Sequence, residues 1–166
     1  MQSGDLTAGG FQRRDRAQLG TQGHKRVQKS RPDGYDTEVE ISCLIDGVTP
    51  PLEVRWRIDG LYPAKEPVIL EEIKTTTLSL DLVQADHNPL HWGQAQCYAF
   101  MYAQKYQLPE INIHLTYYQL DSHEEKTFER HFMWAELEAF FSHLVTAYLS
   151  WFQKVQAWQA RRDASI

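Results

Sequence analysis

The 166 residues of this chain are 42% hydrophobic and 23% charged, which suits one globular domain and excludes collagen-like or wholly disordered proteins. Two cysteines exclude a disulfide framework, a four-cysteine zinc site and an iron–sulfur cluster. The net charge of −5 argues against a uniformly basic nucleic-acid-binding surface. No signal-peptide core and no apolar run of roughly 18 residues occurs, so we expect a soluble, cytoplasmic protein with no membrane partner.

The first half of the chain predicts an arm, a helix and three strands. Residues 1–16 are rich in glycine and polar residues and lack periodicity, so we expect a flexible arm. Residues 20–30 have a helical pattern that ends in turn-forming residues. Apolar and polar residues alternate over 35–45 and 52–59, and a third strand is expected over 68–76. Three consecutive strands indicate a meander.

The second half predicts helix, strand and helix. Apolar and aromatic residues recur at helical spacing over 90–106, alternate over 111–117, and return to helical spacing over 127–160. Residues 161–166 are expected to form a tail, which leaves one folded domain over 17–160. The order α-β-β-β-α-β-α predicts an α/β fold with a mixed four-stranded sheet flanked by helices.

Two acidic residues and a lysine fall at the ends of adjacent predicted strands. Glu72 and Lys74 are two residues apart and point to one face of their strand, whereas Glu71 points to the other. Asp59 ends the preceding strand, where a hairpin brings it beside Glu72. Neighbouring carboxylates repel unless a cation separates them, and hard oxygen ligands suit Mg²⁺ or Mn²⁺. The pattern predicts a metal site, although a salt-bridged exposed strand would carry the same residues.

The helix expected over 90–106 adds a polar stripe. His91, Gln94 and Tyr98 lie three and four residues apart and therefore share one side of the helix. Gln94 can hydrogen-bond a water molecule or the scissile phosphate, and Tyr98 can contact the DNA backbone or stack on a base. For His91 and Tyr98, a partly buried side chain without a role in catalysis explains the spacing equally well.

Basic residues are concentrated near the start of the chain. Residues 11–32 contain seven lysines and arginines and one aspartate. This segment is a candidate surface for phosphate groups, and a solvated helix face explains it equally well.

Asp59, the run Glu72-Ile73-Lys74, and Gln94 with Tyr98 together resemble the motifs of the PD-(D/E)XK nuclease superfamily, in its RecB-like branch. The resemblance implies a restriction-endonuclease-like core over 17–160. It departs at Ile58, which stands where the motif has a proline that supplies no chemistry. Over 4–151 the chain is similar to the nuclease module that precedes DinG-like superfamily-two helicases.

The resemblance also implies further metal ligands. Gly20-Thr21-Gln22-Gly23-His24 is similar to the G-x-x-x-H helix motif of the RecB-like branch, which makes His24 a candidate ligand, with Gln28 one turn later. The implied metal set is completed by Asp59, Glu72 and the backbone carbonyl of Ile73.

The expected function is metal-dependent hydrolysis of phosphodiester bonds in DNA, with single strands or single-stranded ends favoured. Asp59, Glu72, Lys74, Gln94 and Tyr98 would form the catalytic set, and Mg²⁺ or Mn²⁺ would be the cofactor. No phosphate loop of the G-x-x-x-x-G-K-[ST] type occurs, so the chain would be the nuclease module of a larger helicase–nuclease or a stand-alone relative. DNA repair is one compatible role.

Two other expectations concern partners. A catalytically idle nuclease fold that binds DNA or docks a protein is the alternative function. The aromatic residues between Trp151 and Trp158 exceed what one helix face must bury, so we expect a helicase domain, another partner or a second copy to dock on the C-terminal helix.

Overall fold

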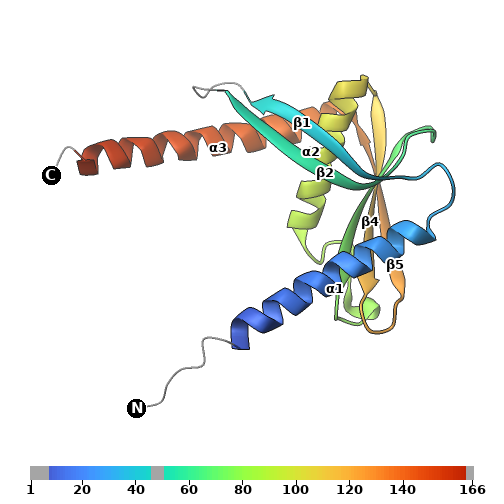
Figure 1. The fold of residues 1–166 in the computed structure, drawn as a ribbon. Helices are drawn as coiled ribbons and strands as arrows, with labels where there is room; N and C mark the ends of the chain where they lie inside the picture. Colours follow the sequence, from blue (N-terminus) through green and yellow to red (C-terminus); the bar gives the residue numbers. More distant parts are fainter. Residues whose placement is uncertain (1–7, 46–50, 164–166) are drawn as a thin grey trace, which may run out of the picture.

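The computed structural model describes residues 8–45 and 51–163, with side chains for 17–45 and 51–162. Within these residues the chain has an α/β fold with a five-stranded mixed sheet and three α-helices (Figure 1). The helices are α1 (Ala8–Ser30), α2 (Pro89–Tyr106) and α3 (Trp134–Asp163), and a short 3-10 helix, η1, spans Leu80–Leu82. The strands are β1 (Asp36–Ile45), β2 (Leu52–Tyr62), β3 (Ile69–Thr76), β4 (Glu110–Gln119) and β5 (Glu125–Met133).

The sheet follows chain order, β1-β2-β3-β4-β5. The first three strands are antiparallel neighbours, as the meander prediction required. The connection from β3 to β4 passes through α2 and makes those two strands parallel. β5 then returns antiparallel to β4 and forms the second edge of the sheet.

Helices cover both faces of the sheet. The larger hydrophobic core joins α2 residues such as Ala95 and Ala99 to Leu70 of β3 and Ile113 of β4. On the opposite face, Val27 of α1 packs with Ile73 and other buried residues. α1 approaches this face closely at Gly23, where a Cβ atom would lie 2.6 Å from the Thr75 side chain. Glycine therefore sets the distance between α1 and the sheet.

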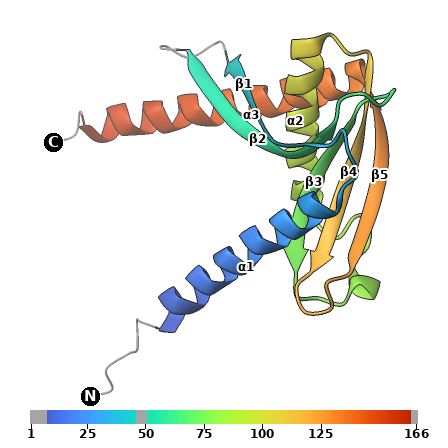
Figure 2. The same cartoon turned by 45° about the vertical axis from the view of Figure 1, so that its right-hand side comes forward.

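α3 begins against the core and extends away from the sheet (Figures 1 and 2). Its first residue, Trp134, stacks on Phe100 of α2 with ring centroids 5.1 Å apart, and Phe141 stacks on the same ring at 4.2 Å. Farther along, Trp151 and Trp158 are exposed, at 58% and 59%. The aromatic segment expected to bind a partner thus lies on the part of α3 that leaves the body of the protein.

The prediction of four strands and of a helix from residue 127 is wrong. Residues 125–133 form β5, and α3 starts only at Trp134. Phe128 and Phe132 are four residues apart, a spacing that fits both the helical period and the strand period of two. In β5 they alternate with exposed residues. The helix start is marked by Glu136, whose carboxylate accepts a hydrogen bond from the Met133 N–H at 2.8 Å, as in a capping box.

The predicted ends of the domain also need correction. α1 already begins at Ala8, so residues 8–16 are helical and do not form an arm; residues 1–7 lie outside the described residues. α3 continues to Asp163, so residues 161–163 belong to the helix, and the rest of the predicted tail lies outside the description. No described helix is long and apolar enough to cross a membrane.

Candidate active site

The candidate site lies where β2 separates from β3. These strands pair only between Gly60–Tyr62 and Ile69–Glu71. The carbonyls of Val68 and Thr76 accept bonds from the β4 side, so the even-numbered residues of β3 direct their backbone groups toward β4. Ile73 is odd-numbered, and its N–H and carbonyl therefore face the gap beside β2.

The Asp59 carboxylate fills part of this gap. Its Oδ2 accepts a hydrogen bond from the Ile73 N–H at 2.8 Å, in place of the backbone bond that a continued ladder would supply. Its Oδ1 lies 3.3 Å from Nδ1 of His24. One side chain thus links β2, β3 and α1.

α1 brings two polar side chains to the same place, one turn apart. His24 contacts the Asp59 side chain, while Gln28 donates from Nε2 to the Asp59 carbonyl and to the Glu38 carboxylate, both at 2.8 Å. The close approach at Gly23 makes these contacts possible, because it brings the adjacent turn of α1 onto the sheet.

On β3, a chain of hydrogen bonds runs from Glu72 to α2. Nζ of Lys74 donates to Oε1 of Glu72 at 2.7 Å and to Oε1 of Gln94 at 2.8 Å. Nε2 of Gln94 donates to the Tyr98 hydroxyl at 2.6 Å. Lys74 is 21% exposed, whereas Glu72 is 2% exposed, so the ammonium group lies between the buried carboxylate and solvent.

The electrostatics of the site centre on Glu72. Burial, reinforced by the negative charge of Asp59, raises the pKa of Glu72 to about 7. Its Oε2 is buried and has no hydrogen-bond partner among the described residues. The hydrogen bond with Asp59 raises the pKa of His24. A carboxylate pair is thus held together with one oxygen unsatisfied, as expected for a site that attracts a cation.

The described residues contain no cluster of three or more His, Cys, Asp or Glu side chains arranged to hold a metal ion. The nearest set pairs Asp59 and Glu72 with His24 and the Ile73 carbonyl. Asp59 points its two oxygens at His24 and at the Ile73 N–H, and Glu72 points one at Lys74. The donor types suit Mg²⁺ or Mn²⁺, and only Glu72 Oε2 among these side-chain oxygens is unpartnered.

Glu71 belongs to a separate network on the other face of β3. Arg31 reaches both of its oxygens, at 2.5 and 3.0 Å, and Tyr35 and Thr116 donate to it at 2.6 Å each. Despite its burial, these donors lower the pKa of Glu71. Because Arg31, Tyr35 and Thr116 satisfy both of its oxygens, Glu71 is a structural anchor that ties β3 to the segment after α1 and to β4.

The structure brings His24, Asp59, Glu72, Ile73, Lys74, Gln94 and Tyr98, the whole predicted set, into one contiguous region. His91 is directed elsewhere: its Nδ1 lies 2.8 Å from the Tyr117 hydroxyl and its Nε2 3.1 Å from the Asn88 amide. Burial lowers the pKa of His91 to about 4.

Two basic residues in or just after α1 serve structural contacts. Arg31 binds Glu71, and Arg26 lies within hydrogen-bond distance of Tyr118 and His123. Lys25 remains exposed beside the site, in a cleft of about 670 Å³ that also contains His24 and Asp59. The side chains of residues 11–16 lie outside the description.

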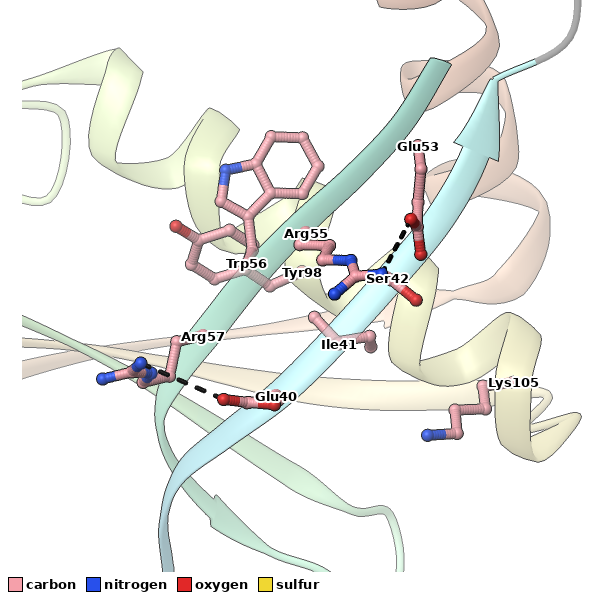
Figure 3. A pocket seen from close by; sticks show the side chains of 9 residues that line it. All are labelled: Glu40, Ile41, Ser42, Glu53, Arg55, Trp56, Arg57, Tyr98 and Lys105. Carbon is pink, nitrogen blue, oxygen red and sulfur yellow. Dashed lines mark hydrogen bonds and ion pairs between the residues drawn. The ribbon is translucent and has the colours of Figure 1, made fainter. Parts of the chain in front are cut away.

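Sequence reasoning overlooked Arg57 and Trp56. Arg57 lines the cleft beside Asp59 and a second cleft on the outer strands, in which Trp56 packs against Tyr98 with ring centroids 5.8 Å apart. Both residues, labelled in Figure 3, lie on β2 shortly before Asp59. An arginine and a tryptophan so close to a predicted metal ligand were the feature of the sequence that could have pointed to them.

No protein-family model matches this chain, and no curated protein matches it. A solved structure titled "Crystal structure of SSO0001" is similar over 79% of this chain, with 21% sequence identity and a TM-score of 0.48. The match spans 60% of the length of that structure. Similarity at this level carries no argument about function.

Proposed function

We propose that this chain is a metal-dependent nuclease that hydrolyses phosphodiester bonds in DNA, built on a restriction-endonuclease-like core of the RecB-like PD-(D/E)XK type. The observation that carries the proposal is the buried carboxylate of Glu72, held beside Asp59 with Oε2 unpartnered and Lys74 bound to its other oxygen. The ion pair with Lys74 alone does not explain why the other oxygen of Glu72 is left without a partner beside a second carboxylate.

The donor chemistry fits a hard divalent cation. Asp59, Glu72 and the Ile73 carbonyl, with His24, are the groups that would hold Mg²⁺ or Mn²⁺. Such an ion supplies a lowered pKa for an attacking water and neutralises charge on a phosphate. The unpartnered Glu72 oxygen and the repulsion from Asp59 both favour cation binding, because a bound ion removes both costs.

Within the protein, Lys74 is the group placed to act on the reacting phosphate. Its ammonium lies between Glu72 and Gln94 and is partly exposed to solvent. A positive charge held there stabilises the negative charge that develops on phosphate oxygens. Gln94 orients Lys74 and is itself oriented by Tyr98, so these two residues fix the position of the ammonium.

The direct test is cleavage of labelled single-stranded and duplex DNA with Mn²⁺, Mg²⁺ or EDTA. Lys74→Ala should lower kcat by roughly 10²–10³-fold, the range for loss of one transition-state charge partner. Lys29→Ala, an exposed lysine of α1, is the matched control and should leave kcat unchanged. Unchanged kcat in Lys74→Ala would remove Lys74 from the mechanism.

Calorimetric titration with Mn²⁺ separates the nuclease from an idle fold. The wild-type chain should bind Mn²⁺, and Asp59→Ala and Glu72→Ala should each abolish most of that binding. Binding of Mn²⁺ by a wild-type protein that cleaves neither single-stranded nor duplex DNA would favour the docking or DNA-binding alternative. Absence of Mn²⁺ binding would contradict the metal site itself.

A further inference from the structure

One apolar stripe runs along α3 from the core into solvent (Figures 1 and 2). It starts with Leu137 and Phe141, which are buried against the body of the protein, where Phe141 stacks on Phe100 of α2. Beyond the body it continues with five residues at alternating intervals of three and four: Leu144, Tyr148, Trp151, Val155 and Trp158. We call these five residues the α3 stripe.

The spacing of the α3 stripe is that of a coiled coil. Apolar residues at alternating intervals of three and four keep one side of a helix facing a partner helix. From Leu137 to Trp158 every position of this repeat is apolar or aromatic. Core residues cover the repeat at its start, whereas Leu144, Trp151 and Trp158 are 45%, 58% and 59% exposed. The α3 stripe therefore continues an interface that is already formed where the helix begins.

The charge along α3 favours a second copy of the chain in antiparallel orientation. Residues 134–153 contain two glutamates and no lysine or arginine, whereas residues 154–163 contain three basic residues and one aspartate. The first part of α3 is therefore acidic, and its end is basic. Two α3 helices that pair antiparallel bring the basic end of each to the acidic part of the other, whereas a parallel pair sets like charges side by side.

The antiparallel arrangement also matches the apolar residues of the two helices. When Tyr148 faces Trp151 of the second copy, Leu144 faces Val155 of that copy, because the intervals of three and four are exchanged when one helix is reversed. Symmetry repeats both contacts. Each side chain can then pack between residues of the opposite helix.

The same register brings Trp158 beside Phe141 of the second copy, where a cleft is open. The cleft measures about 310 Å³ and lies between α3 and the end of β1. Four of its six lining residues are apolar: Leu44, Ile45, Phe141, Ser142, Val145 and Thr146. Leu44 is 65% exposed, so this wall lacks a covering side chain. The exposed tryptophan near the end of one helix thus meets an uncovered apolar cleft near the start of the other.

The size of the exposed surface sets the expected affinity. The exposed halves of Tyr148, Trp151 and Trp158 offer roughly 300 Å² on each copy, since a fully buried aromatic residue encloses about 150–250 Å². With the aliphatic residues and the two clefts, the pair buries roughly 1,000 Å² in total, below the usual range of stable complexes. We therefore expect a reversible dimer with a Kd in the micromolar range or weaker. Dilute protein is then monomeric, and its stability does not depend on the α3 stripe.

We propose that the α3 stripe is a self-association surface, through which two copies of this chain pair their C-terminal helices antiparallel and each places Trp158 in the cleft beside Phe141 of the other. A second copy is the occupant that the chain supports, because one helix supplies both the acidic and the basic part, and both the tryptophan and its cleft. The inference goes beyond the proposed nuclease function and is independent of it, so failure of either leaves the other standing.

Sedimentation equilibrium of the whole chain, from about 1 µM to about 1 mM, tests the association. The weight-average mass should rise reversibly from 19.4 kDa toward twice that value. Trp151→Ala should raise the Kd of the dimer by roughly 10–100-fold, because the symmetric dimer loses two buried tryptophans. Gln153→Ala, at an exposed polar position of the same helix, and Tyr106→Ala, an exposed aromatic residue of α2, are the matched controls and should leave Kd unchanged.

Trp158→Ala, at the far end of the α3 stripe, should raise Kd in the same direction, and circular dichroism checks that both tryptophan variants keep the helix. A chain that stays monomeric at the highest concentration would overturn the inference and leave the α3 stripe to a different protein. An unchanged Kd in Trp151→Ala would overturn it as well. An equal loss of association in Tyr106→Ala would show unspecific contact between exposed rings and would also contradict the proposal.

Disulfide formation tests the antiparallel register. In a Cys43→Ser background, Leu144→Cys mixed with Val155→Cys should form a linked dimer, because these positions face each other in the antiparallel pair. Each variant alone should remain unlinked. Linkage of either variant with itself would indicate a parallel pair and overturn the register, and so would absence of linkage in the mixture.

Discussion

The side chain of Asp59 accepts a hydrogen bond from the backbone N–H of Ile73 at 2.8 Å and so takes the place of a strand partner where β2 leaves β3. Ile73 is fully buried, and its N–H therefore depends on this contact. The same carboxylate is a proposed metal ligand, which couples the strand geometry to the site.

Asp59→Asn and Asp59→Ala should differ in stability although both remove the charge. The Asn amide oxygen can still accept the Ile73 N–H, whereas Ala leaves that buried donor without a partner, at a cost of about 1–3 kcal/mol. Urea denaturation in EDTA should therefore give a lower free energy of unfolding for Asp59→Ala than for Asp59→Asn. Equal values would show that the Ile73 N–H finds another acceptor.

The stability contributed by Glu72 should decrease as pH rises. The pKa of Glu72 is raised from 4.5 to about 7 in the folded protein, so the folded state favours the protonated carboxyl group. The cost of ionising Glu72 therefore lowers the free energy of unfolding progressively between pH 4.5 and 7, and the full loss is present above pH 7. In EDTA, Glu72→Gln should gain on the order of 2 kcal/mol over wild type at pH 8 and nothing at pH 4. Glu138→Gln, at an exposed position of α3, is the control variant. A constant difference across this pH range would contradict the raised pKa.

Breaking the buried pair of Arg31 and Glu71 should be costly. Glu71 is 2% exposed, and Arg31→Ala leaves its charge without its main partner, which costs about 3–5 kcal/mol. Thermal denaturation should show partial recovery in the double variant Arg31→Ala with Glu71→Gln, because the uncompensated charge is gone. Arg55→Ala breaks an exposed pair and should cost less than about 1 kcal/mol. A similar loss of stability in Arg31→Ala and Arg55→Ala would show that the buried Arg31–Glu71 pair contributes no more than an exposed ion pair.

Gly60 should tolerate no side chain while Tyr35 is present. A Cβ atom at Gly60 would overlap the Tyr35 ring, whose hydroxyl donates to Glu71 at 2.6 Å. Gly60→Ala should therefore lower the melting temperature, and in combination with Tyr35→Ala it should cost much less than the sum of the two single changes. Additive losses would mean that the clash is relieved elsewhere.

The two ends of α3 should respond differently to loss of tryptophan. Trp134 stacks on Phe100 and lies half-buried, so Trp134→Ala should cost about 2–3 kcal/mol. Trp158 is 59% exposed, and Trp158→Ala should change the free energy of unfolding by less than about 0.5 kcal/mol. Sedimentation of both variants examines the expected docking role of this segment, which stays a prediction; unchanged solubility and association in Trp158→Ala would count against it.

Much of the architecture was predictable because local periodicity reports local structure. The meander, the strand over 68–76 and the helix over 90–106 appear where alternation and helical spacing placed them. β5 was not predictable in this way, since Phe128 and Phe132 fit both periods. Only pairing with β4 selects the strand.

The candidate residues were found in the sequence because their chemical types and spacings are read along the chain. The sequence alone identifies the residues that carry the carboxylates, the amine and the amide. Strand geometry adds that Glu71 and Glu72 face opposite sides of one strand. Only the tertiary structure determines three other features: the separation of β2 from β3, the burial that raises the pKa of Glu72, and the packing of Trp56 on Tyr98. Each depends on contacts between segments far apart in the chain, and no local pattern records the distance between them.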